Sequence, residues 1–392
     1  MTGPADPGTS EQLLYDVVVI GGGQAGLAVA WHLSRHGLRY VVLDAAAELG
    51  DSWRSRWDSL QLFTPAEYDG LPGLPFPAAA RSYPVKDEVA DYLQTYVRTF
   101  RLPVRLGVLV TGLSRTDGGF EIRTAGGTLH ARQVVVATGA FQVPFIPAVA
   151  AGLDASVTSV HSSGYRNPGA LPDGPVLVVG AGNSGFQIAE ELAATRAVDL
   201  AVGTRYPTLP QRLLGRDLFW WLMHLRLSGV STSSRLGRRL QSRSDVVIGS
   251  SSRRLRRAGV GFRPRLVDAS GSTVRFADDT SLDVGAVVWA TGYRSDYTWM
   301  EIPGVLVDGS VVHDRGVSEI PGLYFLGMPW QHTRGSALLG FVDSDAAHVS
   351  GIAGEHHRAA LPDLAAPPPT VPSSRSAPAQ ETSQTTTSDR PS

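Results

Sequence analysis

A short glycine pattern that occurs twice constrains the fold of this chain most strongly. The first copy, GGGQAG at residues 21–26, follows the apolar run 16–20 and precedes a helical pattern. The second copy, GAGNSG at residues 180–185, stands in the same way after the apolar run 176–179. Between a strand and a helix, such glycines permit a tight turn, the approach of backbone amides to a pyrophosphate, and close packing of helix on strand. We therefore predict two dinucleotide-binding loops, formed by Gly21, Gly23, Gln24 and Gly26 and by Gly180, Gly182, Asn183, Ser184 and Gly185.

The residue that ends the second strand of each unit differs between the two copies. After the first loop the run RYVVLD ends in Asp44, whose carboxylate is suited to accept hydrogen bonds from ribose hydroxyl groups. After the second loop the run VDLAVGTR ends in Thr204 and Arg205, and a guanidinium is suited to bind a 2′-phosphate. These residues favour FAD in the first unit and NADPH in the second. The alternative for Arg205, in a chain rich in arginine, is a side chain that only faces solvent.

Short apolar runs alternate with helical patterns through most of the chain. Alternation of strand and helix is typical of an α/β fold in which helices cover parallel sheets. The predicted strands are residues 16–20, 40–43, 134–137, 176–179, 199–202, 286–290 and 323–326.

The composition excludes several classes of site and partner. Cysteine is absent, which excludes disulfides, zinc ribbons, iron–sulfur clusters and thiol redox chemistry. The net charge of −1 gives no reason to expect a nucleic acid or an anionic membrane as a partner. The N-terminal MTGPADPGTSEQ lacks the features of a signal peptide, and no apolar run has the length of a membrane span. We therefore expect a cytoplasmic protein that acts on a small molecule and has no metal site.

Two segments of the form ATG indicate where the chain crosses between domains. In each, an apolar run ends at a Thr–Gly pair, Thr138–Gly139 or Thr291–Gly292, where a bulkier residue would block the backbone. Together with the two loops they resemble the flavoproteins with two dinucleotide-binding domains, in which such segments lead between an FAD domain and an inserted NADPH domain. The resemblance implies an FAD domain at 12–155 and 286–358 and an NADPH domain at 156–285. Residues 359–392, rich in Pro, Ser and Thr, are predicted to be disordered.

The segment before the second loop narrows this resemblance. VTSVHSSGYRNP, residues 157–168, is similar to the fingerprint of flavin-containing monooxygenases, with His161 and Tyr165 at the matching positions. The segments 50–77 and 322–353 are similar to bacterial proteins of this kind that are related to plant YUCCA enzymes. The disulfide reductases of the same superfamily use a cysteine pair, which this chain lacks. We expect His161 to order the hinge between the domains rather than to move protons.

The resemblance implies a reaction in which NADPH reduces FAD and the reduced flavin captures O2 as a C4a-hydroperoxide. Oxygen then passes to nitrogen or sulfur of a small substrate, and the apolar insert described below favours a hydrophobic or aromatic one. Three alternatives stay open. They are a YUCCA-like oxidative decarboxylation of a 2-oxo acid, an NADPH oxidase or reductase without oxygen transfer, and a nucleotide sensor whose flavin hardly turns over.

The resemblance also implies residues beside the flavin within the segment 50–77. Trp53 and Arg54 are implied as cofactor contacts. Classical flavin-containing monooxygenases carry, near the reactive edge of the flavin, an asparagine two residues before a proline. This chain has Phe63 at that position, and Thr64 or Gln61 is expected to supply the polar contact instead.

Two further segments carry predictions with alternatives. TRGS at 333–336 precedes a helical pattern, so that amides around Gly335 and Ser336 at a helix start are expected to face N1 and the C2 carbonyl of the flavin. The alternative is an N-cap that serves the helix alone. Residues 216–230 form an apolar helical insert in the NADPH domain. This insert either packs into the core or forms a lid, a wall of a substrate tunnel or a homodimer contact.

Overall fold

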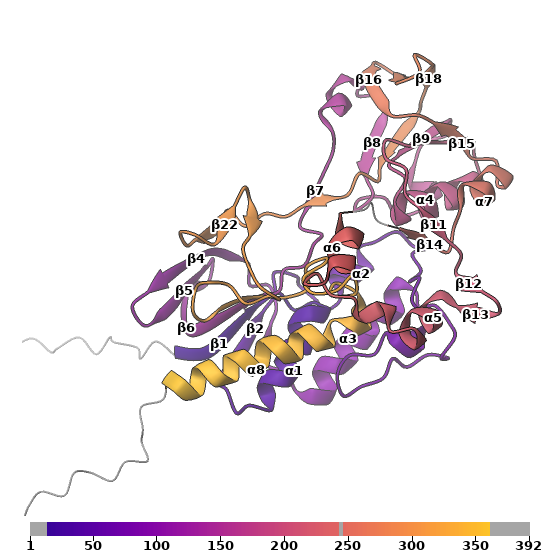
Figure 1. The fold of residues 1–392 in the computed structure, drawn as a ribbon. Helices are drawn as coiled ribbons and strands as arrows, with labels where there is room; N and C mark the ends of the chain where they lie inside the picture. The colour runs from indigo at the N-terminus through magenta and orange to yellow at the C-terminus, as the bar shows by residue number, and fades with distance from the viewer. Residues whose placement is uncertain (1–13, 243–245, 361–392) are drawn as a thin grey trace, which may run out of the picture.

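The computed structural model describes residues 14–242 and 246–360 as an α/β fold with two lobes, each built on a sheet (Figure 1). The predicted disordered tail lies outside the described residues from 361 onward. Residues 359 and 360 belong to the last helix, α8 (Asp343–Ala360). Within the described ranges, no helix combines the length and the hydropathy that a membrane span requires.

The sheet of the first lobe is mainly parallel. Its strands are β1 (Leu14–Ile20), β2 (Tyr40–Leu43), β3 (Val104–Arg105), β4 (Val110–Thr116), β5 (Gly119–Thr124), β6 (Gly127–Val136), β21 (Met300–Glu301) and β24 (Leu323–Phe325). They lie in the order β21-β4-β5-β6-β1-β2-β3, with β24 also paired to β6. β1 pairs in parallel with both β2 and β6, whereas β4, β5 and β6 form an antiparallel meander. The loop after β1 therefore opens at the carboxyl edge of a parallel sheet, where ligands of α/β folds bind.

Three helices pack together on this sheet. α1 (Gln24–Ser34) packs against both α3 (Lys86–Phe100) and α8, and α8 runs beside α1 in Figure 1. Their core includes the fully buried side chains of Leu27, Leu93 and Val349. His32 Nε2 on α1 lies 2.7 Å from Asp343 Oδ1 at the start of α8. These contacts hold α1, and with it the first glycine loop, in a fixed position.

The sheet of the second lobe is entirely parallel. Its strands are β8 (Thr158–His161), β9 (Val176–Val179), β10 (Val198–Ala201), β15 (Gly261–Arg263) and β19 (Ala286–Trp289), in the order β15-β10-β9-β19-β8. The helix α4 (Asn183–Ala193) follows the second glycine loop and packs on β9 and β10. A small antiparallel sheet, β16 (Leu266–Ser270), β17 (Thr273–Phe276) and β18 (Ser281–Asp283), completes this lobe. Each of the seven predicted strands lies on a strand of one of the two main sheets.

The predicted boundary between residues 285 and 286 is wrong. Residues 286–289 form β19, which pairs with β9 on one side and with β8 on the other, in the middle of the second sheet. The second domain therefore continues through Trp289. The Thr291–Gly292 pair, a few residues later, is where the chain leaves this domain.

Two short strands connect the lobes. β7 (Val143–Pro144) and β20 (Tyr293–Arg294) pair in antiparallel register, directly after the Thr138–Gly139 and Thr291–Gly292 segments. Figure 1 shows β7 between the two lobes. The two crossings of the chain are thus joined into one ribbon.

The predicted insert is longer and less helical than its sequence pattern indicated. Only α5 (Leu218–His224) is an α-helix within residues 216–230, and it ends before Leu225, which is 60% exposed. The helix stops there because Arg226 adopts a left-handed conformation with φ +56°. The insert also contains β12 (Arg212–Leu213), β13 (Arg216–Asp217), η4 (Leu227–Gly229) and α6 (Arg235–Gln241), and β11 (Thr208–Leu209), β14 (Val247–Ile248) and α7 (Ser252–Arg257) flank it.

The remaining elements are short. They are α2 (Asp51–Arg54), η1 (Ala66–Tyr68), η2 (Ala148–Gly152), η3 (Pro168–Ala170), β22 (Leu306–Val307), β23 (Ser310–Val311) and η5 (Leu339–Phe341).

Candidate cofactor and substrate site

The first glycine of each loop is required by the backbone that crosses it. Gly21 and Gly180 have φ values of +111° and +110°, a region that side chains rarely adopt. A Cβ atom on Gly21 would lie 2.4 Å from the carbonyl oxygen of Ala137, and one on Gly180 would lie 2.3 Å from that of Ala290. Both carbonyls belong to the segments that lead into the ATG turns. Loop and crossing segment therefore pack directly against each other in both domains.

The last glycine of each loop permits the helix to lie on the loop itself. A Cβ atom on Gly26 would lie 1.9 Å from the Gly21 carbonyl oxygen, and one on Gly185 would lie 1.8 Å from the Gly180 carbonyl oxygen. No side chain fits there without moving the backbone. The fold therefore requires glycine at these two positions for steric reasons.

The middle glycine of each loop faces open space. A Cβ atom on Gly23 or Gly182 would meet nothing within 4 Å, although both residues have ordinary backbone angles, with φ −76° and −80°. Each is the N-cap of its helix, α1 or α4, and no side chain caps either helix. Free backbone amides at a helix start, with room in front of them, fit the pyrophosphate of a dinucleotide. The structure thus provides two such places, one in each lobe.

Residues beside these loops fasten them to other parts of the chain. Gln24 Nε2 donates to the carbonyl oxygen of Ala337, 2.8 Å away, and connects the first loop to the segment before α8. Asn183 Oδ1 accepts from the amide of Ile248, 3.0 Å away, and connects the second loop to β14. Ser184 lies in the first turn of α4 and is partly exposed. Gln24 and Asn183 therefore have structural hydrogen bonds in addition to their predicted positions at the cofactors.

Asp44 lies directly against the first loop. Its Oδ2 accepts a hydrogen bond from the amide of Gly22, and its Oδ1 accepts one from the amide of Ala46, 2.8 Å away. The carboxylate is therefore fixed at the end of β2, beside the place for the pyrophosphate. This position fits an acceptor for ribose hydroxyl groups.

The corresponding place in the second lobe holds two guanidinium groups. Thr204 and Arg205 follow β10 and are exposed. Arg265 Nη2 donates to the carbonyl oxygen of Gly203, 3.0 Å away, so that a second cation lies beside them. Sequence reasoning missed Arg265 because it is distant in the chain. Only the pairing of β15 with β10 brings it to the same sheet edge.

His161 lies at the hinge between the lobes. Its Nε2 is 2.9 Å from the carbonyl oxygen of Gly292, and its Nδ1 is 3.1 Å from the amide of Ser163. Nδ1 therefore accepts and Nε2 carries the proton that it donates to Gly292. Burial lowers the pKa of His161, the hydrogen bond to Gly292 opposes this, and the nearby Arg56 guanidinium lowers the pKa further. A neutral histidine with both nitrogens engaged suits the predicted ordering role.

Tyr165, the second fingerprint residue, is part of the core of the second lobe. Its ring is 1% exposed, and its hydroxyl donates to Glu191 Oε2 on α4, 2.7 Å away. Burial raises the pKa of Tyr165 far above its ordinary value. The residue therefore fixes the turn after β8 on α4.

A glutamine that sequence reasoning missed joins the two crossing segments. Gln142 Nε2 donates to Thr138 Oγ1 and to the carbonyl oxygen of Gly139, each 2.9 Å away. Its Oε1 accepts from the amide of Asp296, 2.7 Å away, on the returning segment. The hydroxyl of Thr291 donates to the carbonyl oxygen of Phe145. Thr138 and Thr291 thus both participate in the hinge.

The structure gives Trp53 and Arg54 different surroundings. Trp53 is partly buried against the core of the first lobe. The Arg54 guanidinium forms ion pairs with Asp91 and, at 3.8 Å, with Asp87, both on α3. These ion pairs engage the guanidinium that the resemblance implied as a cofactor contact.

The structure does not bring Phe63, Thr64 and Gln61 together as one polar site. Phe63 stacks on Phe219 of α5 with ring centroids 6.1 Å apart. Thr64 is buried, and its hydroxyl donates to Oδ1 of Asp69. Gln61 is exposed, and its Nε2 donates to the carbonyl oxygen of Tyr83, 3.1 Å away. Thr64 and Gln61 therefore already have partners within the protein.

Asp69 is the acidic group that sequence reasoning missed in this segment. Its side chain is fully buried, and Oδ2 has no hydrogen-bond partner among the described residues. Burial raises the pKa of Asp69 from 3.8 to about 7, although the hydrogen bond from Thr64 acts in the opposite direction. An unpaired carboxylate is costly inside a protein, so protonation near neutral pH relieves that cost.

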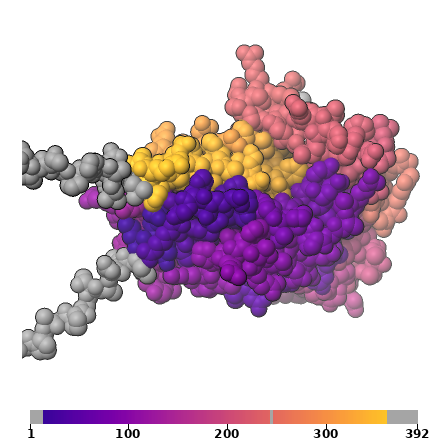
Figure 2. Space-filling view, turned by 90° about the horizontal axis from the view of Figure 1, so that it is seen from below, coloured from indigo at the N-terminus to yellow at the C-terminus, as the bar shows by residue number. Residues whose placement is uncertain are grey.

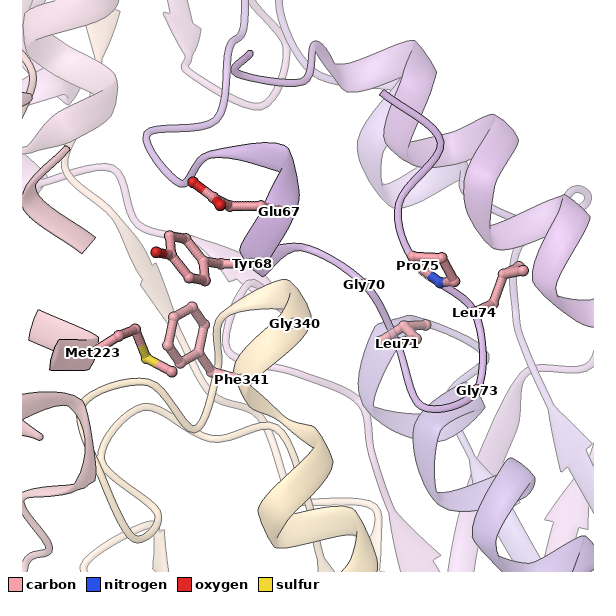
Figure 3. A pocket seen from close by; sticks show the side chains of 10 residues that line it. All are labelled: Glu67, Tyr68, Gly70, Leu71, Gly73, Leu74, Pro75, Met223, Gly340 and Phe341. Atoms are coloured by element: carbon pink, nitrogen blue, oxygen red, sulfur yellow. The ribbon is translucent and has the colours of Figure 1, made fainter. Parts of the chain in front are cut away.

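A pocket of about 440 Å³ lies where the insert meets the first lobe. The loop from Glu67 to Pro75 forms one wall, Gly340 and Phe341 form another, and Met223 of α5 contributes a third (Figure 3). In Figure 3 the side chains of Tyr68, Phe341 and Met223 are drawn on one side of the pocket and that of Leu71 on the other. The insert therefore contributes Met223 to a pocket wall. Leu218 and Phe219 of the same helix are buried in a small apolar cluster with Ile248, as the core-packing interpretation predicted. A role of the insert as a lid or a wall of a substrate tunnel stays a prediction.

The predicted helix start at TRGS is wrong. α8 begins at Asp343, residues 334–337 form a turn, and Thr333 forms a β-bridge with Ser231. Ser336 is fully buried, and its Oγ accepts from the amides of His332 and Thr333 at 3.1 and 3.0 Å. A Cβ atom on Gly335 would lie 3.0 Å from Cβ of Phe341. The two amides that were expected to face the flavin are satisfied by Thr333, because Gly335 donates to its Oγ1 and Ser336 donates to its carbonyl oxygen. The polar groups of TRGS therefore hold a turn instead of starting a helix.

Comparison with known proteins identifies the family. The model of the pyridine nucleotide-disulphide oxidoreductase family matches residues 18–207. A protein of Geobacillus kaustophilus named as an uncharacterized CzcO-like oxidoreductase is 44% identical over 340 residues, which cover 86% of this chain and 98% of that protein. This chain belongs to the class B flavin monooxygenase-like family.

Two further members of this flavin monooxygenase-like group extend the similarity. Indole-3-pyruvate monooxygenase YUCCA1 of Oryza sativa subsp. japonica is 29% identical over 378 residues, covering 85% of this chain and 90% of that protein. The solved flavin-containing monooxygenase from Stenotrophomonas maltophilia matches with a TM-score of 0.73 and 29% identity, covering 88% of this chain and 99% of that one. The predicted fold class and family resemblance are confirmed. The chain is a flavin-dependent oxidoreductase with places for FAD and a nicotinamide dinucleotide.

Proposed function

We propose that this chain is an NADPH-dependent FAD monooxygenase that oxygenates nitrogen or sulfur of a small hydrophobic or aromatic substrate. One observation carries the proposal. Two loops of matching geometry hold space for two pyrophosphates, but a carboxylate follows one loop and two guanidinium groups lie beside the other. Two different dinucleotides are therefore bound by one chain that has no cysteine for thiol chemistry.

Each cofactor has its own set of residues. The amides at the start of α1, with Gly23 and Asp44, would hold FAD, which supplies hydride and oxygen chemistry when bound. The amides at the start of α4, with Gly182, would hold the nicotinamide dinucleotide. Arg205 and Arg265 favour its 2′-phosphate, because a guanidinium binds phosphate through charge-assisted hydrogen bonds, whereas a carboxylate at this place would repel the phosphate.

The pocket supports an apolar substrate. Tyr68, Phe341 and Met223 give it aromatic and thioether surfaces, and Glu67 is the one charged side chain among the described residues of its lining. Small-molecule sites combine apolar and aromatic side chains with polar groups that fix the orientation of the ligand. The carboxylate of Glu67 offers an acceptor for a nitrogen-bearing substrate.

Two alternative functions are each favoured by one specific observation. The similarity to an indole-3-pyruvate monooxygenase favours oxidative decarboxylation of an aromatic 2-oxo acid. Phe63 packs on Phe219 and offers no polar group, which favours an NADPH oxidase without oxygen transfer. A cytoplasmic location, the lack of a nucleic-acid partner and a homodimer remain predictions from the sequence.

The test measures how NADPH oxidation is coupled to product. The purified flavoprotein is supplied with NADPH and O2, with and without an aromatic sulfide, an aromatic amine or an aromatic 2-oxo acid. Oxygenation predicts that sulfoxide or N-oxide forms as NADPH is consumed, with little hydrogen peroxide. Carbon dioxide from the oxo acid would favour the decarboxylase. Recovery of all the reducing equivalents as hydrogen peroxide or water, whatever the additive, would contradict oxygen transfer.

A further inference from the structure

The insert carries a large share of the exposed apolar side chains. Of the seventeen large apolar residues exposed in the described part of the chain, eight lie between residues 209 and 240. Leu214 is the most exposed of all, at 83%, and Leu225 and Leu236 follow within the insert at 60% and 52%. Such a concentration exceeds the scattered single leucines of an ordinary surface and marks an interaction surface.

The same residues carry a strong local positive charge. Residues 209–242 contain six arginines, Arg212, Arg216, Arg226, Arg235, Arg238 and Arg239, against one acidic residue, Asp217, which gives a net charge of +5 in a chain whose total is −1. Asp217 is engaged internally, since it caps α5 and accepts from Tyr83 and Gln211. Among the ion pairs of the described residues, none involves one of the six arginines.

The insert projects from the body of the protein. Figure 2 shows the salmon-coloured residues, between about 200 and 250 on the bar, as a ridge that rises beyond α8. The hairpin β12–β13 places Leu213 and Leu214 at its turn, flanked by Arg212 and Arg216. Trp221 Nε1 donates to the carbonyl oxygen of Leu213, 2.9 Å away, and so holds this hairpin on α5.

We propose that this ridge, residues 209–242, is an interfacial membrane-binding surface. Its leucines enter the boundary between headgroups and acyl chains, and its arginines bind anionic headgroups. Apolar tips flanked by cations, with tryptophan nearby, are the combination that binds anionic bilayer surfaces without spanning them. The inference goes beyond the proposed function. It departs from the expectation of no membrane partner, which rested on the net charge of the whole chain.

Charge and shape favour a bilayer over another protein. In a symmetric dimer through the ridge, two surfaces of charge +5 would meet, and like charges repel across an interface. A protein partner would also need a cavity shaped to each projecting leucine, whereas a fluid bilayer adapts to a convex apolar tip. Both features of the ridge thus match an anionic lipid surface.

The ridge is continuous with the pocket. Met223 is both 41% exposed and part of the pocket wall. Further along the insert, the amide of Thr232 donates to the carbonyl oxygen of His332, 2.7 Å away, beside the turn before η5. A surface seated on lipid would therefore place the mouth of this pocket near the bilayer.

The experiment is co-sedimentation of the full flavin-loaded chain with lipid vesicles. One set of vesicles mixes phosphatidylglycerol with phosphatidylcholine, and the other contains phosphatidylcholine alone. We expect binding to the anionic vesicles that weakens as salt is raised, because salt screens exposed charges. The double variant L213Q/L214N should bind at least about tenfold more weakly, since each leucine loses apolar burial. R212Q/R216Q should lose about tenfold on anionic vesicles.

A matched variant and two further measurements make the test decisive. Val307→Asn changes an exposed residue, 58%, in the other small hairpin, β22–β23, and should bind vesicles as the parent does. Flavin absorbance and NADPH oxidation are measured on every variant, so that loss of folding or of the proposed activity is seen separately. Failure of the parent to bind anionic vesicles, or equal binding by L213Q/L214N, would overturn the proposal. A dimer that dissociates in L213Q/L214N, by light scattering and without vesicle binding, would assign the ridge to a second copy instead.

Discussion

At the scale of single residues, the three glycines of each loop differ in what requires them. The first and last glycines meet backbone atoms of the protein itself, whereas Gly23 and Gly182 face open space. The sequence pattern predicted a separate role for each of them: a tight turn, room for a pyrophosphate, and close packing of helix on strand. It could not predict that the carbonyl oxygens of Ala137 and Ala290 lie against the first glycines, because these residues are distant in the chain.

The middle glycines provide a direct test of the cofactor assignment. Gly23→Val should give a folded protein without visible flavin absorbance, because the new side chain occupies space where the pyrophosphate would lie. Gly182→Val should keep the flavin and lose NADPH binding. Gly26→Ala is the control for a purely structural effect. Its Cβ would lie 1.9 Å from the Gly21 carbonyl oxygen, so this variant should have a lower melting temperature. A yellow Gly23→Val protein would contradict the assignment of FAD to the first loop.

Arg205 and Arg265 should determine the preference for NADPH. Each charge-assisted hydrogen bond to the 2′-phosphate is worth about 1.5–3 kcal/mol, so either alanine variant should lower kcat/KM for NADPH by about ten- to a hundredfold. The kcat/KM for NADH should hardly change. Arg275→Ala, an exposed arginine on β17 of the same domain, is the control. Equal losses with both nucleotides would assign the two arginines to something other than the 2′-phosphate.

Asp69 should make stability depend on pH. Its pKa is raised from 3.8 to about 7, so burial of the charged form costs stability progressively as pH rises through that interval, by at most about 4 kcal/mol. Asp69→Asn keeps an acceptor for Thr64 and removes the ionisation. Chemical denaturation should show the variant gaining stability relative to the parent between about pH 4 and pH 8. A constant difference over this range would show that Asp69 does not titrate there.

At the scale of elements, periodicity predicted strands well and helix ends poorly. Seven apolar runs proved to be strands because both faces of a parallel sheet are covered, which leaves an unbroken apolar signal. The apolar pattern at 216–230 also predicted a long helix. It ends at His224, because Arg226 takes a left-handed conformation that no sequence pattern marked. TRGS looked like a helix start, but its hydroxyls serve a turn.

The hydrogen bonds of Gln142 at the hinge should affect how fast NADPH reduces the flavin. Gln142 connects both crossing segments, so Gln142→Ala should loosen their alignment without removing either cofactor place. We expect flavin content to stay normal while anaerobic reduction of the flavin by NADPH slows by about tenfold or more, since hydride transfer depends on precise positioning. Gln94→Ala, which removes one hydrogen bond to Leu49 within the first lobe, is the control. An unchanged rate of flavin reduction in Gln142→Ala would show that the hydrogen bonds of Gln142 do not position the two lobes for hydride transfer.

At the scale of the whole molecule, the sequence predicted two domains, one inserted in the other, but not the position of β19. Nor could it predict the ridge. A net charge of −1 is an average over the chain. The local charge of +5 can be counted in residues 209–242, but only the fold shows that this segment projects and that many of its leucines are exposed. Likewise Arg265 and Gln142 became visible only when distant segments were brought to one sheet edge or one hinge. Motifs are local, whereas these arrangements depend on contacts between distant residues.

The ribbon of β7 and β20 has a mechanical consequence. Two antiparallel strands joined side by side bend easily across their plane but resist twisting and shear, since either motion would break the hydrogen bonds between them. Asp58 of the first lobe adds to this restraint, because its amide donates to the carbonyl oxygen of Arg166 and its Oδ2 accepts from Asn167. The second lobe is therefore held in one orientation relative to the first. A nicotinamide carried by that lobe would meet the flavin from a single direction, always presenting the same side of its ring.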